Sequence, residues 1–183
     1  DLFEKYENGN RDFGLIDKLS IKSEIRNDAA LSSDLYQIIL DNPESFSNDS
    51  IERAELYFAK IDVKNSDLYK INRFIIKYED SDNISAAYNI IISHYRSMNN
   101  SLLEADTYQK LITLIPLNSS ILNSYAWRMS ELEINLEDAL EKVNIGLGLI
   151  EENNSSYPQI LDTKAEVLWK MKLFDQAIES IDE

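Results

Sequence analysis

The stretch NSYAWRMSELEINLEDALEKV, residues 123–143, decides the fold of this chain. Its apolar residues recur every three or four positions on both sides of a short polar break, which is the spacing of one face of an α-helix. With the residue just before the stretch included, the two apolar sets are Leu122, Tyr125, Ala126 and Met129, then Leu136, Ala139, Leu140 and Val143. Two amphipathic helices joined by so short a break predict an antiparallel helical hairpin.

The same helical spacing continues through the rest of the chain. The 183 residues include only 4 Gly and 3 Pro, too few to turn a many-stranded sheet. The sequence therefore predicts an all-α chain of roughly ten helices. Further apolar sets of this kind are Leu31, Leu35, Ile38 and Ile39; Ala54, Tyr57, Phe58 and Ile61; Ala87, Ile90, Ile91 and Tyr95; Ala105, Tyr108, Ile112 and Ile115; Leu161, Ala165, Leu168 and Trp169; and Phe174, Ala177, Ile178 and Ile181.

Polar residues mark where several helices should begin. Ser101 with Glu104 three residues later predicts a capping box, and Asn135 with Asp138 predicts a looser one. Pro158 suits the first turn of a helix. Helices should stop near Pro116 and before the polar residues 151–156. Acid-before-base pairs spaced by four, which favour an exposed helical face, are Asp106/Lys110, Asp138/Lys142 and Glu166/Lys170.

Small residues recur at long intervals. Ala105, Ala139 and Ala177 fall in the second helix of successive expected hairpins, 34 and 38 residues apart, and Ala126 and Ala165 fall 39 apart in the first helices. Small residues allow the two helices of a pair to cross closely. This pattern resembles the tetratricopeptide (TPR) family, whose repeat is a helical hairpin with small residues in both helices. The resemblance implies a right-handed superhelix of antiparallel hairpins, a TPR-like α-solenoid.

The resemblance is strongest over residues 119–183, weaker over 83–118 and poor before that. We therefore expect a divergent helical region over residues 1–82 and TPR-like repeats over 83–183, about two and a half hairpins with the last truncated. The sequence starts at Asp1 without a methionine and stops at Glu183 inside a helical pattern. These ends predict that the chain is a piece of a longer protein.

The amino-acid composition excludes several classes of function. There are 33 acidic and 18 basic residues, a net charge of -15, which would repel nucleic acid and anionic membranes. No apolar run approaches the roughly 20 residues that a membrane-spanning helix needs. The chain has no Cys and one His, His94, so thiolate sites, zinc sites and Ser-His-Asp chemistry lack their residues. We expect no cofactor, no metal and no catalytic residues.

The two tryptophans, Trp127 and Trp169, permit two interpretations. They could pack in the core, or they could anchor a bound peptide, because Trp is enriched at interaction hot spots. By helical register they fall on the face of the first helices that lines the inner groove of a TPR-like superhelix. The other residues expected on that face are Asn123, Asp162, Glu166 and Lys170.

The expected function is a non-catalytic scaffold that binds another polypeptide or braces a neighbouring domain of the same chain. Asp162 and Glu166 would repel the C-terminal carboxylate that some TPR proteins hold, so a basic or neutral partner is expected. A hydrolase would need a nucleophile beside a base, and the sequence shows no such pair.

A second resemblance offers an alternative. The opening residues 6–12, YENGNRD, with Asn123, Ala126-Trp127 and Leu161-Asp162-Thr163, are similar to the helical region that follows the thioredoxin domain in some bacterial proteins. This resemblance implies a Cys-x-x-Cys domain upstream and a location in the periplasm or cell envelope. Without it, the expected location is the cytoplasm.

Overall fold

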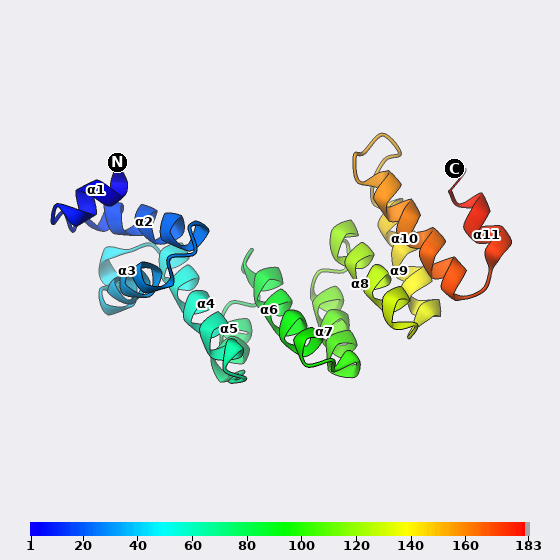
Figure 1. Cartoon of the computed structure of the whole chain (residues 1–183), viewed down its shortest axis with the longest axis horizontal. Helices are drawn as coiled ribbons and strands as arrows, with labels where there is room; N and C mark the ends of the chain where they lie inside the picture. Colours follow the sequence, from blue (N-terminus) through cyan, green and yellow to red (C-terminus); the bar gives the residue numbers. More distant parts are fainter. Residues whose placement is uncertain (182–183) are drawn as a thin grey trace. The chain divides into compact units, whose positions relative to one another are not determined.

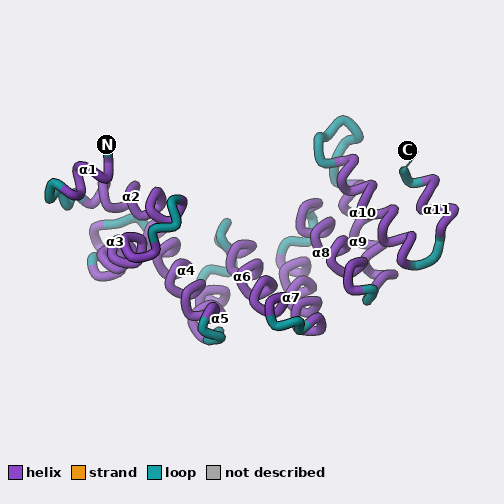
Figure 2. Tube along the Cα trace, in the orientation of Figure 1, coloured by secondary structure: helices purple, strands orange, loops and turns teal. Residues whose placement is uncertain are grey.

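The computed structural model describes residues 1–181, and in this range it contains eleven α-helices, one short 3₁₀-helix and no β-strand. Figure 1 gives the order of the helices, and Figure 2 shows that only loops and turns separate them. The all-α prediction is confirmed. No helix in residues 1–181 is both long and apolar enough to span a bilayer.

The chain divides into two compact units, Asp1–His94 and Tyr95 onward. The predicted division at residue 82 concerns where the repeat pattern begins, so it stays a prediction. Unit 1 contains α1 (Leu2–Glu7), α2 (Phe13–Ile25), α3 (Ala29–Asp41), η1 (Pro43–Ser45), α4 (Asn48–Lys64), α5 (Tyr69–Lys77) and most of α6 (Ile84–Ser97). Unit 2 contains α7 (Ser101–Leu114), α8 (Ser119–Leu132), α9 (Leu136–Gly148), α10 (Tyr157–Lys170) and α11 (Phe174–Glu179).

The core of unit 1 is built where α2, α3 and α4 pack together. Its buried residues are Ile16, Leu19, Leu35, Tyr36, Ile39, Ala54 and Tyr57. The two tyrosines keep their hydroxyls satisfied, because Tyr36 donates to Glu24 at 3.0 Å and Tyr57 donates to the carbonyl of Ala29 at 3.1 Å. Buried polar groups with partners cost far less than unpaired ones, so two tyrosines are compatible with this core.

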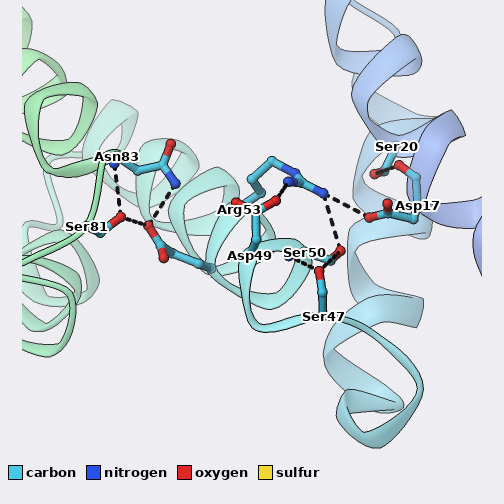
Figure 3. A network of polar contacts seen from close by, with 9 residues as sticks. Asp17, Ser20, Ser47, Asp49, Ser50, Arg53, Ser81 and Asn83 are labelled. Atoms are coloured by element: carbon cyan, nitrogen blue, oxygen red, sulfur yellow. Dashed lines mark hydrogen bonds and ion pairs between the residues drawn. The ribbon is translucent and has the colours of Figure 1, made fainter.

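Polar contacts along α4 hold unit 1 together (Figure 3). The Arg53 guanidinium bonds Asp17 of α2 at 2.9 Å and also pairs with Asp49 of its own helix. Towards the other end of the network, Glu52 accepts hydrogen bonds from Ser81 and from Asn83, the latter at 2.8 Å. The α2 helix and the loop before α6 are thereby both tied to α4.

In unit 2, α8 and α9 form the hairpin predicted from residues 123–143. The predicted apolar set of α8 is buried, and Ala139 and Val143 of α9 are buried against it. The other small residues of the repeat pattern are buried as well, at Ala105, Ala165 and Ala177. In Figure 1, α8, α9 and α10 lie side by side, and the contacts between these three helices agree.

Two predicted helix caps are wrong. The helix α7 is capped by Asn100, whose side chain accepts from the backbone N–H of Leu103 at 3.2 Å, so Ser101 is already helical. Asn135 does precede α9, but its backbone is left-handed, with φ of 52°, and its side chain makes no cap hydrogen bond. The predicted box with Asp138 therefore does not form. The placement of Pro158 in the first turn of α10 is confirmed.

Candidate partner-binding groove

Two adjoining pockets of unit 2 share Trp127 and Asp162, and we refer to them together as the groove. The first, of about 270 Å³, is mainly apolar and lies between α8, α10 and α11. The second, of about 420 Å³, is mainly polar and lies between α8, α10, Arg96 of α6 and Tyr108 of α7. The apolar pocket is lined by Trp127, Asp162, Ala165, Glu166, Trp169, Ala177, Ile178 and Ile181.

Helical periodicity explains why these side chains share one surface. On α8, Asn123 and Trp127 are four residues apart and therefore lie on one face, while Leu122, Tyr125, Ala126 and Met129 turn to the core. On α10, Asp162 and Glu166 are four apart and Trp169 follows three later, again on one face. The packing that buries the apolar stripes thus directs the remaining faces of both helices into the groove.

Both tryptophans lie in the groove with much of their surface open. Trp127 is 40% exposed and Trp169 is 54% exposed. Trp169 is held by an edge-to-face contact with Phe174 of α11, at 4.7 Å between ring centroids. Exposed aromatic surface in a concave site is typical of sites that bind a partner.

A fully buried carboxylate, Glu104 of α7, organises the floor of the polar pocket. Arg128 binds it through Nε at 2.8 Å and Nη2 at 3.1 Å, and Arg96 binds it through Nε at 2.8 Å. The hydrogen bond to Glu104 is the main reason that the pKa of Arg128 lies above its usual value. Arg128 also binds Glu131 at 3.1 Å. The two arginines are therefore already partnered, and they stiffen the floor.

Two acceptors in the groove have no donor. The carboxylate of Asp162, which lies where the two pockets meet, makes no hydrogen bond or ion pair with any residue of the described range. The Oδ1 atom of Asn123 is buried and also has no hydrogen-bond partner in the structure. Because the Asp162 side chain is exposed, a ligand that brings a cation or an N–H group can pair with its carboxylate.

Five of the six residues predicted to bind a partner line the groove: Asn123, Trp127, Asp162, Glu166 and Trp169. The sixth, Lys170, does not line it, because its ammonium bonds Glu133 at 3.1 Å and lies 3.8 Å from Glu166. Whether any of the six contacts a partner remains a proposal.

Sequence reasoning did not find Glu104, Arg96 and Arg128. The sequence predicts Glu104 in a capping box, whereas the structure buries it on α7 beside Ala105. The position of Glu104 next to an alanine of the repeat pattern could have indicated an ion pair, because an acid on the packed face of a helix needs a cation from a neighbouring helix.

A second polar cluster braces the α8–α9 hairpin. Asp138 accepts hydrogen bonds from Tyr125 and, at 2.6 Å, from Gln109, and Lys142 lies 3.2 Å away. Burial alone would raise the pKa of Asp138, but the bonds from Tyr125, Lys142 and Gln109 outweigh burial and hold it below its usual value. Burial and the bond to Asp138 raise the pKa of Tyr125 well above its usual value.

Two neighbouring acidic residues, Glu131 and Glu133, pair with different cations. Glu131 binds Arg128 at 3.1 Å, whereas Glu133 binds Lys170 at 3.1 Å. Two carboxylates with separate cations do not form a general acid-base pair, which needs two groups facing one reacting centre. Among residues 1–181 no group of three or more His, Asp or Glu residues is placed to hold a metal ion.

Comparisons with known proteins bear on the fold. No protein-family model matches the chain, and no curated protein matches it. Solved structures do: the "MamA protein" aligns with a TM-score of 0.64 at 12% identity, covering 93% of this chain and 88% of that one. BtubC (BKLC) from P. vanneervenii aligns with a TM-score of 0.67 at 12% identity, covering 97% and 81%. "MamA MSR-1 C2" aligns with a TM-score of 0.57 at 13% identity, covering 93% and 92%.

MamA and BtubC are TPR-like helical-repeat proteins. The chain has a TPR-like fold. At 12–13% identity the similarity concerns the fold alone and does not indicate which ligand this chain binds. These neighbours give no support to the resemblance to the region after a thioredoxin domain.

Proposed function

We propose that the chain is a non-catalytic scaffold whose unit 2 groove binds a basic or neutral segment of another polypeptide or of a neighbouring domain. The TPR-like fold supports a protein-interaction role at the coarse level. The observation that carries the finer proposal is Asp162, a carboxylate without a partner that lines the same pocket as two half-exposed tryptophans.

The chemistry of the groove selects the partner. A Lys or Arg side chain can lie against an indole ring and at the same time pair with Asp162, since cations are attracted to aromatic faces. The arginines of the floor do not compete for an acidic ligand, because Glu104 and Glu131 already neutralise them.

The proposal is tested with an array of tryptophan-free peptides of roughly ten residues, long enough to follow a groove in extended form. The array varies charge from acidic to basic at constant apolar content. Binding that Asp162→Lys weakens should be confined to the basic and neutral members, so that acidic peptides bound elsewhere on the chain do not count. Preference for acidic peptides in this groove would contradict the proposal.

A charge reversal then assigns the binding to the groove. Asp162→Lys should weaken binding of the selected basic peptide by about tenfold or more, because it replaces attraction by repulsion at a residue that lines both pockets. Glu141→Lys is the matched control, since Glu141 is exposed on α9 and lines neither pocket. Equal binding by the two variants would place the peptide elsewhere.

The thioredoxin-linked alternative is not proposed, because no observation on residues 1–181 and none of the structural neighbours favours it.

A further inference from the structure

Unit 1 contains a separate groove of about 700 Å³ between α3, α4 and α5. Its lining includes apolar side chains from all three helices, Leu40 of α3, Phe58 of α4 and Phe74 of α5, and the charged residues Glu55, Lys70, Arg73 and Lys77. Phe74 is buried, whereas Leu40 and Phe58 are partly exposed. We refer to this site as the basic groove, for the charges at its rim.

One face of α5 opens into the basic groove. Tyr69, Arg73 and Ile76 are four and three residues apart, the spacing of one helical face, and all three line the groove. Tyr69 is 65% exposed and Ile76 is 77% exposed. Two large apolar side chains therefore stand at the mouth of an apolar groove without cover from the rest of unit 1.

The charge of α5 opposes that of the chain. Its nine residues include three bases and no acid, in a chain with 33 acidic and 18 basic residues. Lys70 is paired with Asp62 at 2.8 Å and Lys77 with Glu55 at 2.7 Å. Arg73 makes no ion pair with any of residues 1–181, and its guanidinium lies 5.7 Å from the centre of the Tyr69 ring. The rim thus presents a cation with unused capacity.

We propose that the basic groove binds an acidic amphipathic segment of another polypeptide. Apolar side chains of the segment enter between Phe58 and Phe74 and cover Ile76, and a carboxylate pairs with Arg73. An arginine fork matches a carboxylate in two parallel hydrogen bonds, which gives the contact direction as well as attraction. The apolar part of the lining selects a peptide over nucleic acid, whose backbone the net charge of -15 repels.

This inference does not rest on the function proposed for the unit 2 groove. The two sites lie in different units and have opposite charge preferences: one offers an unpaired carboxylate and the other an unpaired guanidinium. One scaffold would then hold two partners of different chemistry.

The test uses a fluorescein-labelled peptide of roughly 14 residues, four helical turns, with Leu and Phe on one face and Glu and Asp on the other. A second peptide carries Lys in place of every acid. Fluorescence anisotropy should show binding of the acidic peptide and at least tenfold weaker binding of the basic one, measured with the whole Asp162→Lys chain so that the unit 2 groove does not capture the basic peptide. Affinity for the acidic peptide should fall as salt rises, because salt screens the rim charges.

Variants assign the binding to the basic groove. Arg73→Glu should weaken binding of the acidic peptide by about tenfold or more. Ile76→Gln should weaken binding several-fold, because it removes exposed apolar area. Lys18→Glu is the matched control, because Lys18 is exposed on α2, makes the same charge change and lines no part of the groove. Circular dichroism of each variant checks that its helix content is unchanged, and Arg73→Gln supplies a milder second variant.

Two results would overturn the proposal. Equal loss of affinity in Arg73→Glu and Lys18→Glu would mean that only the net charge matters. Concentration-dependent association of the chain in sedimentation velocity, abolished by Arg73→Glu and unaffected by the acidic peptide, would identify a second copy of this chain as the occupant. Asp162→Lys should leave acidic-peptide binding unchanged, so failure here is distinguishable from failure of the unit 2 proposal.

Discussion

Replacing Glu104 by glutamine removes one negative charge from the floor of the unit 2 groove with almost no change in side-chain volume. The carboxylate is fully buried and accepts three N–H hydrogen bonds, at 2.8, 2.8 and 3.1 Å, from Arg96 and Arg128. In Glu104→Gln, an amide NH₂ group faces guanidinium donors, so at least one of these bonds becomes a contact between two donors.

The magnitude follows from how well the arginines can recover water. Removing one partner of a buried ion pair costs roughly 3–5 kcal/mol. The side chain of Arg96 is 47% exposed and can be rehydrated, whereas that of Arg128 is only 18% exposed. The lower end of the range therefore applies, about 3 kcal/mol, which corresponds to a fall in Tm of roughly 6–12 °C for a chain of this size.

Thermal unfolding followed by circular dichroism at the helical band measures this loss, with chemical denaturation as an independent check. The double variant Glu104→Met, Arg128→Met should recover more than half of it, because replacing both buried charges by apolar groups avoids an unpaired one. A Glu104→Gln variant that melts within about 2 °C of the parent would refute the reasoning.

Three further changes test the packing of unit 2. Gly146→Ala should raise the free energy of unfolding by about 0.5–1 kcal/mol in urea titrations, because Gly weakens a helix interior. A Cβ at this position would meet its nearest atoms at 3.6–3.8 Å, which is ordinary van der Waals contact. A lower free energy of unfolding in the variant would contradict this fit. Ala139→Asp should cost more than about 3 kcal/mol by burying an unpaired charge, and a parent-like melt would exclude the repeat register. Because the folded pKa of Asp138 is depressed, its contribution is present above the unfolded pKa near 4 and is lost as pH falls, so Asp138→Asn should flatten the acid limb of stability against pH; equal slopes would contradict this.

Much of unit 2 follows from residue spacing. The apolar stripe of α8 and the small residues Ala139 and Ala177 are buried where the pattern predicts, because helical periodicity fixes which face packs. The same periodicity places Asn123 and Asp162 on the remaining faces, and the structure brings both into the groove. Local periodicity was sufficient for these features since each depends on one helix at a time.

Features that depend on several helices were not predictable. Lys170 has the right register for the groove, but Glu133 from the α8–α9 loop takes its ammonium. Glu104 becomes a buried ion-pair centre only because Arg96 and Arg128 reach it from 8 and 24 residues away. Ser101 and Asn100 are both good cap residues, and the sequence alone does not decide between neighbours.

The most direct test of the central claim uses the intrinsic fluorescence of the chain. It has two tryptophans, Trp127 and Trp169, and both line the unit 2 groove, so their emission reports on that site. Binding of the selected basic, tryptophan-free peptide should shift the emission to shorter wavelength and reduce quenching by iodide, since the ligand covers the exposed indole surface. Saturable binding of that peptide with unchanged emission and unchanged quenching would contradict the account.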